Sequence, residues 1–201
     1  MTPITMFIRM PDPPPLTILP AIQPAIALET GSVFGKARSE IDGSINELRA
    51  ARALATLPDG DVFPSPTGSL SYSRRIPVGV IGLITPWNFP MALAMRVIAP
   101  ALVLGNAVLL KPDPQTPVTG GDHLVALFRR AGLPEGLLQA VPGDATIGEA
   151  VVVDEAVDMV SFTGSTAAGR RVGAAAGALL KRVSLELGGN NPMIVLDDVD
   201  V

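Results

Sequence analysis

The sequence predicts an α/β fold in which helices cover both faces of a parallel β-sheet. After Pro77, short apolar runs of strand length alternate with longer segments of helical character. The runs are continuously apolar, as is typical of parallel strands buried on both sides. Hydrophobic residues make up 48% of the 201-residue chain and charged residues 17%, which supplies a core and excludes disorder of the whole chain. We therefore expect one α/β domain with smaller appendages.

Three appendages are expected before this domain. Residues 1–27 contain seven prolines and are expected to form an extended, disordered tail. Residues 28–60 are expected to form a helical segment, because apolar residues recur there at helical spacing. Residues 61–76 are expected to form an extended arm that bends at Thr67-Gly68-Ser69. A strand pair alone is marginally stable, so this arm needs a partner sheet.

The individual elements follow the apolar pattern along the chain. Each expected strand is a short apolar run, and each later helix is a longer segment between two runs, the last being rich in alanine and glycine. The expected strands are Val78–Ile84, Ala107–Leu110, Leu138–Val141, Met159–Phe162, Val183–Leu187 and Met193–Leu196. The expected helices are Ser39–Leu54, Met91–Leu104, Val118–Ala131, Ile147–Val153 and Ala167–Leu180. Sheets of this kind bind ligands at the carboxyl ends of their strands.

Composition excludes several kinds of partner. The net charge is −4 and the pI about 4.9, so no basic surface for nucleic acid is expected. The chain has no cysteine, which excludes disulfides and thiolate metal sites, and we expect no metal site. The longest apolar run, Val97 to Leu110, is interrupted by Pro100, Gly105 and Asn106 and is too short to cross a membrane. A cytoplasmic location is the expectation.

Two polar side chains follow the first two strands of the predicted sheet. Asn88 lies in a loop held by Pro86 and Pro90, where its amide could donate to a developing oxyanion or satisfy its own turn. Lys111 ends the second strand, where its ammonium could hold a ribose or phosphate, or could be a capping or surface lysine.

The last two strand ends carry a phosphate signal and a carboxylate. Thr163-Gly164-Ser165-Thr166 opens a helix, and free N–H groups at a helix N-terminus favour phosphate, although an ordinary helix cap has the same appearance. Glu186 precedes Gly188-Gly189, so its carboxylate could reach a water as general base or could form a strand-end salt bridge.

Together, these segments resemble the aldehyde dehydrogenase superfamily from residue 28 to residue 201. The segments that carry the resemblance are Pro86-Trp87-Asn88-Phe89, Lys111-Pro112, Phe162-Thr163-Gly164-Ser165-Thr166 and Glu186-Leu187-Gly188-Gly189. Two further segments look most like the benzaldehyde and vanillin dehydrogenase branch: Lys111-Pro112-Asp113-Pro114 and Gly188-Gly189-Asn190-Asn191-Pro192.

The resemblance implies an NAD- or NADP-dependent oxidation of an aldehyde, with aromatic aldehydes as one option, to the carboxylic acid. It makes residues 77–187 a modified Rossmann-type NAD(P)-binding domain, residues 61–76 part of an oligomerisation arm, and residues 188–201 the start of a catalytic domain. Asn88 matches the oxyanion amide and Glu186 the general base. The residues matched to the cofactor site are Ile84, Thr85, Pro86, Trp87, Lys111, Gly143, Gly148, Phe162, Gly164, Ser165, Leu187 and Gly188.

Two departures from the family pattern affect these expectations. A glutamate often follows the ribose-binding lysine by three residues and repels a 2′-phosphate, but Pro114 stands there, so we expect weak discrimination between NAD and NADP. The catalytic cysteine of the family is also missing, so the chain is expected to be a fragment that is inactive alone. A second chain could supply that cysteine, and members of the family are homo-oligomeric. The alternatives are a non-catalytic nucleotide-binding module or an oligomerisation module acting through the arm.

Overall fold

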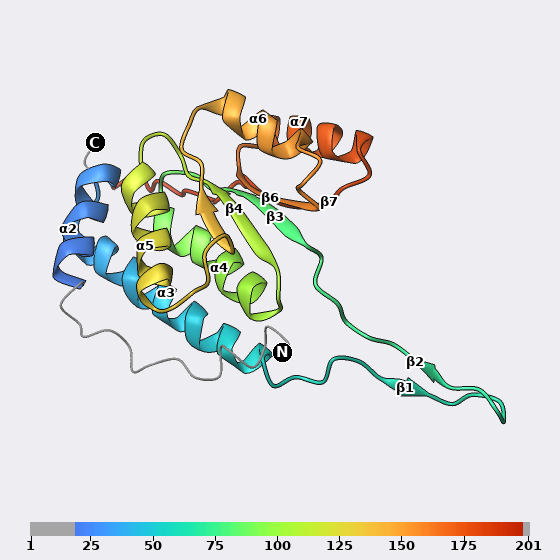
Figure 1. The fold of residues 1–201 in the computed structure, drawn as a ribbon. Helices are drawn as coiled ribbons and strands as arrows, with labels where there is room; N and C mark the ends of the chain where they lie inside the picture. The colour runs from blue at the N-terminus through green and yellow to red at the C-terminus, as the bar shows by residue number, and fades with distance from the viewer. Residues whose placement is uncertain (1–18, 199–201) are drawn as a thin grey trace.

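A parallel five-stranded sheet forms the centre of the computed structural model, which describes residues 19–198 (Figure 1). Its strand order is β5-β4-β3-β6-β7, and all neighbouring strands are parallel. The chain starts at the central strand, moves outward to one edge, and returns to build the other, so the order reverses between β3 and β6. The strands are β3 (Val80–Ile84), β4 (Ala107–Lys111), β5 (Leu138–Ala140), β6 (Met159–Gly164) and β7 (Arg182–Leu187).

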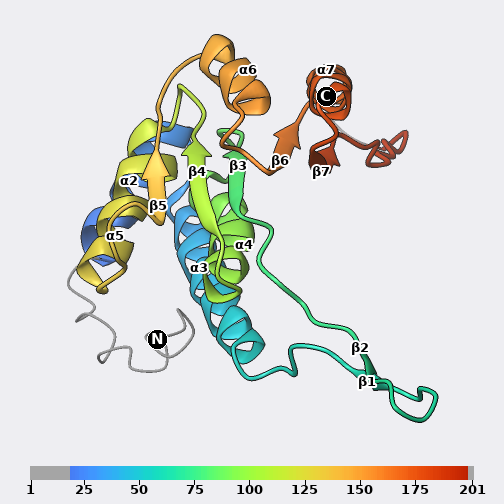
Figure 2. The same ribbon diagram turned by 45° about the vertical axis from the view of Figure 1, so that its right-hand side comes forward.

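Helices cover both faces of this sheet, which confirms the predicted α/β class (Figure 2). One face packs against α4 (Pro90–Val103) and α5 (His123–Arg130), with α3 (Phe34–Leu54) packed on α4 and α2 (Leu19–Thr30) packed on α3. The other face packs against α6 (Ala145–Val153) and α7 (Thr166–Ala178). Within each strand the side chains alternate between these two faces, as the pleat requires. The sheet therefore has an α4 side and an α6–α7 side, and these names are kept below.

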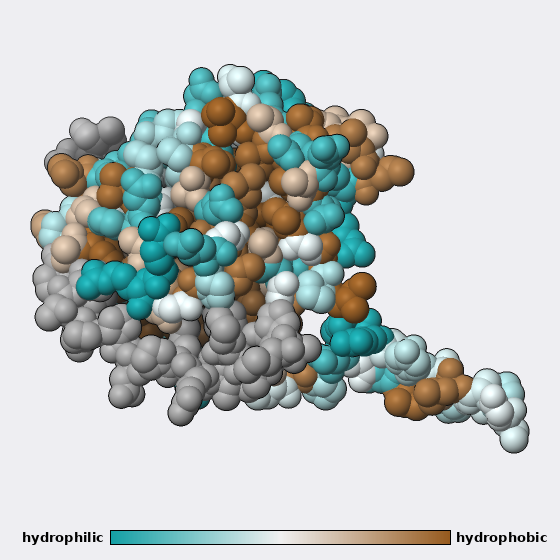
Figure 3. Space-filling view, viewed as in Figure 1, coloured by the Kyte–Doolittle hydropathy of each residue, from teal (hydrophilic) through white to brown (hydrophobic). Residues whose placement is uncertain are grey.

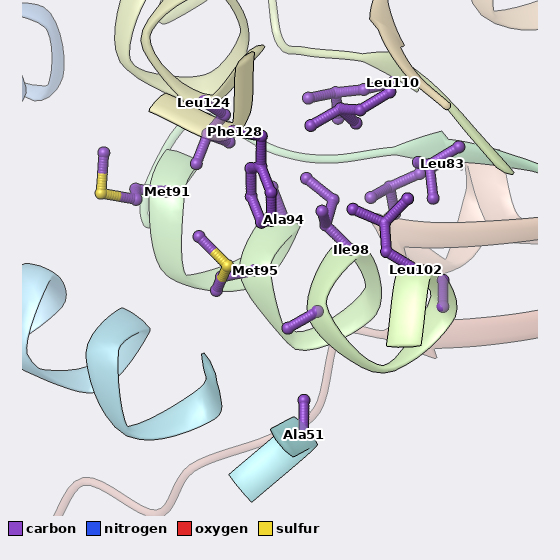
Figure 4. Close-up of a cluster of buried hydrophobic side chains, with 14 of the residues drawn as sticks. Ala51, Leu83, Met91, Ala94, Met95, Ile98, Leu102, Leu110, Leu124 and Phe128 are labelled. Carbon is purple, nitrogen blue, oxygen red and sulfur yellow. The ribbon is translucent and has the colours of Figure 1, made fainter. Parts of the chain in front are cut away.

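The larger core lies on the α4 side (Figure 4). Leu83 and Leu110 reach it from the sheet, and Ile98 reaches it from α4, all three being fully or almost fully buried. Full burial of an aliphatic side chain of this size stabilises a fold by about 1.5–3 kcal/mol. This core anchors α4 and the loop that precedes it against the end of β3.

The predicted tail is wrong for its last residues. Helix α2 occupies Leu19–Thr30, although Pro24 lies inside it and removes one backbone donor. Ile22 and Ile26, one helical turn apart, are both buried in the core on the α4 side. Their burial accounts for a helix where the proline content predicted extended chain. Residues 1–18, the rest of the predicted tail, lie outside the described residues.

Two other predicted elements differ from the structure. Met193–Leu196 is not a strand: among the described residues it has no pairing partner, and Met193 is 86% exposed. The predicted helix Val118–Ala131 begins as the π-helix η2 (Val118–Asp122) and continues as α5. The carboxylate of Glu29 accepts the Val118 N–H at 3.0 Å and the Thr119 N–H at 2.7 Å, which ties the start of η2 to α2.

The arm projects from the body as a hairpin of β1 (Val62–Phe63) and β2 (Ser71–Tyr72) (Figure 1). All four strand residues are exposed, and the space-filling view shows apolar surface along the arm (Figure 3). The predicted hairpin-like bend is therefore present. Within residues 19–198, no helix is long and apolar enough to cross a membrane.

Candidate functional site

The register of the sheet brings the predicted site residues to one edge. Ile84, the last residue of β3, pairs with Lys111 on β4 and with Phe162 on β6. Glu186 on β7 pairs with Thr163 on β6. Because all these strands are parallel, their carboxyl ends meet at one edge, and the segments that follow them lie there too. This is also the edge where the strand order reverses.

Because side chains alternate along each strand, the residues at the carboxyl ends of the strands face two opposite sides of the sheet. Leu109 packs in the core on the α6–α7 side, so Lys111, two residues later, faces the same side. Leu185 also packs on the α6–α7 side, so the next residue, Glu186, faces the α4 side. The ammonium and the carboxylate therefore flank opposite sides of the strand ends, and a ligand that used both would cross those ends.

Lys111 is not the surface lysine that its sequence position also allowed. The residue is 5% exposed, and its ammonium makes no hydrogen bond or ion pair with a described residue. Burial lowers the pKa of Lys111 from its ordinary value, while the charges of Asp113 and Asp144 oppose that shift. Asp144 was not among the site residues predicted from the sequence. The feature that could have indicated it is its position directly before a helix, where its carboxylate caps α6 by accepting the Thr146 N–H at 2.9 Å.

The N-terminus of α7 stands directly after β6. Ser165 caps this helix, because its hydroxyl accepts the Ala168 N–H at 3.2 Å. The interpretation of this segment as an ordinary helix cap is therefore correct for the Ala168 N–H. The N–H groups of Thr166 and Ala167 remain without an acceptor among the described residues. Such free donors, together with the helix dipole, favour a phosphate.

Glycines allow close packing around these strand ends. A Cβ on Gly164 would stand 2.5 Å from the Phe162 ring, so the turn before α7 is tight. Gly148 of α6 is buried against β3, and an added Cβ would lie 3.9 Å from Ile84 Cδ1. Gly143, which precedes α6, lies against Ile147 of that helix. The remaining predicted glycine, Gly188, is exposed beside the start of α7. A Cβ added to Gly188 would lie 4.0 Å from Thr166 Oγ1.

The loop after β3 combines a buried hydroxyl with exposed side chains. The Thr85 N–H donates to the Lys111 carbonyl at 3.3 Å, which holds the two strand ends together. Thr85 Oγ1 is buried and has no hydrogen-bond partner among the described residues. After half-buried Pro86, both Trp87 and Asn88 are exposed. The Asn88 side chain makes no hydrogen bond to its own turn, so the turn-satisfying interpretation of this residue has no support in the described residues.

Glu186 is exposed and forms no ion pair with a described residue, so the salt-bridge interpretation also lacks support. Its neighbour Leu187 turns toward α7, where it lies against Gly169. The described residues do not enclose the carboxylate of Glu186. They therefore provide its position but not the low-dielectric pocket that tunes a general base.

The free donors fit the polar groups of a dinucleotide. An ammonium, a buried hydroxyl and two helix N-terminal amides lie at one strand edge, and such groups bind ribose hydroxyls and phosphates. A separate open groove of about 510 Å³ lies between α5 and β5. It is lined by none of the predicted site residues, although Asp122, Arg129 and Glu135 give it charge.

Comparison with known proteins agrees with this geometry. Residues 20–201 match the profile of the Aldehyde dehydrogenase family. The chain is 50% identical over 174 residues to a benzaldehyde dehydrogenase [NAD(+)] of Pseudomonas putida and 53% identical over 173 residues to a vanillin dehydrogenase of an Amycolatopsis species. Each alignment covers 86% of this chain and 36% of the relative.

A solved structure shares the fold. The NAD-dependent benzaldehyde dehydrogenase of Corynebacterium glutamicum superposes with a TM-score of 0.83 at 41% sequence identity, over 92% of this chain and 40% of that one. The chain thus spans a little over a third of the length of the curated relatives it matches. On this profile match, identity and shared fold, the chain belongs to the aldehyde dehydrogenase family.

Proposed function

We propose that residues 77–187 form the NAD(P)-binding domain of an aldehyde dehydrogenase and that residues 188–201 begin its catalytic domain. The observation that carries this proposal is the register that brings Ile84, Lys111 and Phe162 side by side at the strand ends. Relatives named as benzaldehyde and vanillin dehydrogenases support an aromatic aldehyde as the substrate of the whole enzyme. The reaction is oxidation of that aldehyde to the carboxylic acid.

The adenosine end of the cofactor belongs on the α6–α7 side. Lys111 holds the ribose there, because the residue is 5% exposed and its ammonium has no other partner among the described residues. Gly148 on α6 faces Ile84 on β3 with ordinary van der Waals spacing, and Gly143 lies against Ile147 at the start of α6, so both glycines lie on the wall that α6 forms. Asp113 and Asp144 place negative charge near Lys111. Pro114 still supplies no carboxylate three residues after Lys111, so we keep the prediction of weak discrimination between NAD and NADP.

The pyrophosphate belongs at the N-terminus of α7. Gly164 and Ser165 shape the turn, and the free N–H groups that follow accept the negative charge. Phe162, Leu187 and Gly188 line the approach to this turn. Ile84, Thr85, Pro86 and Trp87 form the wall at the end of β3, where the hydroxyl of Thr85 is available to the ligand.

The catalytic groups belong on the α4 side. When bound, the nicotinamide accepts a hydride. Asn88 donates its amide to the oxyanion that develops on the substrate, and Glu186 takes the proton of a thiol or of the hydrolytic water. A hydroxyl is far less nucleophilic than a thiolate, and these 201 residues contain no cysteine, so the thiolate must come from another chain segment or a second chain.

Assembly follows from the arm. Its exposed hairpin leaves backbone donors and acceptors free for a further strand, which favours a homo-oligomer built through residues 61–76. A cytoplasmic location remains a prediction of the same proposal.

Calorimetric titration of the 201-residue chain with NAD and with NADP tests the proposal. We expect heat of binding with both, and Lys111→Met should weaken binding about ten- to hundredfold, since a hydrogen bond to a charged group contributes about 1.5–3 kcal/mol. Lys181→Met is the matched control: Lys181 precedes β7, at the opposite end of the sheet, and donates to the carbonyl of Asp154.

The absence of binding heat with either cofactor would contradict the proposal, as would an equal loss in both variants. The chain with cofactor and benzaldehyde should form no reduced cofactor. If the chain binds cofactor but stays inactive even with a cysteine-containing catalytic chain, the result would favour the alternative of a non-catalytic nucleotide-binding module.

A further inference from the structure

The first turn of α4 has no local cap. Phe89 occupies the N-cap position and has no side-chain acceptor, while Pro90 at the first helical position has no N–H. The next two donors, the N–H groups of Met91 and Ala92, would be orphaned at the edge of the main core. This turn directly follows Trp87 and Asn88, so an unsatisfied start of α4 would free the loop that carries both.

Glu40 supplies the missing cap from another helix. Its carboxylate Oε1 accepts the Met91 N–H at 2.8 Å and the Ala92 N–H at 3.2 Å. The residue is 2% exposed, and it comes from α3, 51 residues earlier than Met91. A negative charge at a helix N-terminus is favoured by the helix dipole, and two N–H donors offset part of the cost of burying it.

Lys36 completes the arrangement from the same face of α3. Its ammonium pairs with Glu40 Oε2 at 2.6 Å and also lies 4.2 Å from the centre of the Phe89 ring. The ion pair neutralises the buried carboxylate, and the ring contact is a cation–π interaction. One residue pair on α3 therefore holds both the backbone of α4 and the side chain directly before it.

Packing between α3 and α4 does not by itself account for this choice of residues. An aliphatic residue at position 40 would pack between α3 and α4, and hydrophobic replacements of buried ion pairs are often neutral or stabilising. It would not satisfy the two amides or orient Phe89. The ion pair Arg38–Asp42 shows the contrast, because it has the same spacing on α3 but is exposed and forms no hydrogen bond or ion pair with a described residue of α4.

We propose that Glu40 and Lys36 are positioning residues that fix the Trp87-Asn88-Phe89 segment at the end of β3. Glu40 anchors the segment through the first turn of α4, and Lys36 through the ring of Phe89. The consequence for catalysis, a fixed direction of the Asn88 amide, rests on the proposed function. The positioning itself concerns only contacts within this chain.

Trp87 makes the proposal directly measurable, because it is the only tryptophan of the chain. We compare its fluorescence and acrylamide quenching in the 201-residue chain, in Glu40→Gln and in Lys36→Met. The glutamine side chain in Glu40→Gln would present amide hydrogens to the Lys36 ammonium and carry no charge at the helix N-terminus. Since Trp87 is 47% exposed in the ordered loop, release of the loop should raise its quenching constant about twofold in Glu40→Gln and less in Lys36→Met.

Asp42→Asn is the control, since it removes the exposed pair on the same helix and should leave Trp87 quenching unchanged. Far-UV circular dichroism verifies that each variant is folded. If Glu40→Gln does not fold, Lys36→Met decides, because it keeps the capping carboxylate and removes only the cation. Quenching equal to that of the unmodified chain in the folded variants would overturn the proposal.

Cofactor titration of the same variants separates this inference from the proposed function. Failure of the unmodified chain to bind NAD or NADP would remove the proposed function but leave a Trp87 response to Glu40→Gln intact. Normal cofactor binding by the unmodified chain, together with Trp87 quenching that does not change in Glu40→Gln, would support the proposed function and remove the positioning role of Glu40 and Lys36.

Discussion

The carboxyl ends of β3 and β4 differ from the carboxyl end of β7 in how completely the surrounding residues bury them. At β3 and β4, Ile84, Thr85 and Lys111 are all buried, with α4 on one side of the sheet and α6 on the other. At β7, Glu186 is exposed and Leu187 is 38% exposed, with only α7 packed on the strand. The carboxyl ends of the strands thus pass from a packed half, where we propose the cofactor groups, to an open half, where we propose the general base.

This difference separates binding from turnover. The groups proposed for ribose and phosphate are already held in place by the core of the chain, so binding needs little further ordering. The proposed general base lacks an enclosing pocket among the described residues, and these 201 residues contain no cysteine that could serve as the proposed nucleophile. We therefore expect the chain to bind cofactor as one property and to support turnover only with additional protein.

The largest expected contrast is in stability. Leu110→Ala removes a fully buried side chain on β4 and should lower the free energy of unfolding by about 2–5 kcal/mol. Leu187→Ala, the same substitution on β7, should cost about 1–2 kcal/mol, since Leu187 is already 38% exposed. Urea unfolding followed by circular dichroism measures both. Equal losses would show that the β7 end is as well packed as the β4 end.

A smaller contrast is expected for two glycines. A Cβ on Gly82 of β3 would stand 2.7 Å from Val151 Cγ1 and 3.0 Å from Val157 Cγ1 in the core, so Gly82→Ala should destabilise by about 1–3 kcal/mol. The atom nearest to a Cβ on Gly169 would be Leu187 Cδ2 at 2.3 Å, which is the end of a flexible and 38% exposed side chain that can rotate away. Alanine also gains about 1 kcal/mol of helix propensity. Gly169→Ala should therefore be close to neutral in the same unfolding assay. A large loss there would contradict the open state of the β7 end.

The smallest expected effect is the pH dependence caused by Lys111. Burial lowers its pKa below 10.5 in the folded chain, so between the lowered value and 10.5 the unfolded chain binds more protons. The charged lysine therefore costs stability at neutral pH, and this cost disappears as the pH rises toward 10.5. Lys111→Met should be more stable than the unmodified chain at pH 7, with the difference shrinking at high pH. Thermal unfolding across this range checks the trend, and a difference that grows with pH would contradict it.

The sheet and its strand edge could be predicted because the signals are local. Each strand is a continuous apolar run, and the polar residue that follows it, such as Lys111, is visible in the sequence. Parallel pairing then brings the ends together without further information. The prediction was wrong where contacts with a distant segment determine the secondary structure. Helix α2 forms despite its prolines because Ile22 and Ile26 pack in the core. Met193–Leu196 is not a strand because no described residue pairs with it.

The parts that sequence reasoning missed depend on contacts between distant segments. Glu40 reads as one of several charged residues on a helix, and nothing local indicates that it caps α4. Asp144 reads as a helix cap, and its proximity to Lys111 depends on how α6 packs on the sheet. Such residues emerge only when the fold brings the segments together.

If the strand ends converge on one dinucleotide site, NAD should perturb residues at those ends and few others. Amide chemical-shift mapping by NMR during an NAD titration of the 201-residue chain measures this. We expect the largest shifts at Thr85, Lys111, Thr166 and Ala167, with the arm unchanged. Shifts concentrated in the groove between α5 and β5, or scattered over the surface, would contradict this convergence.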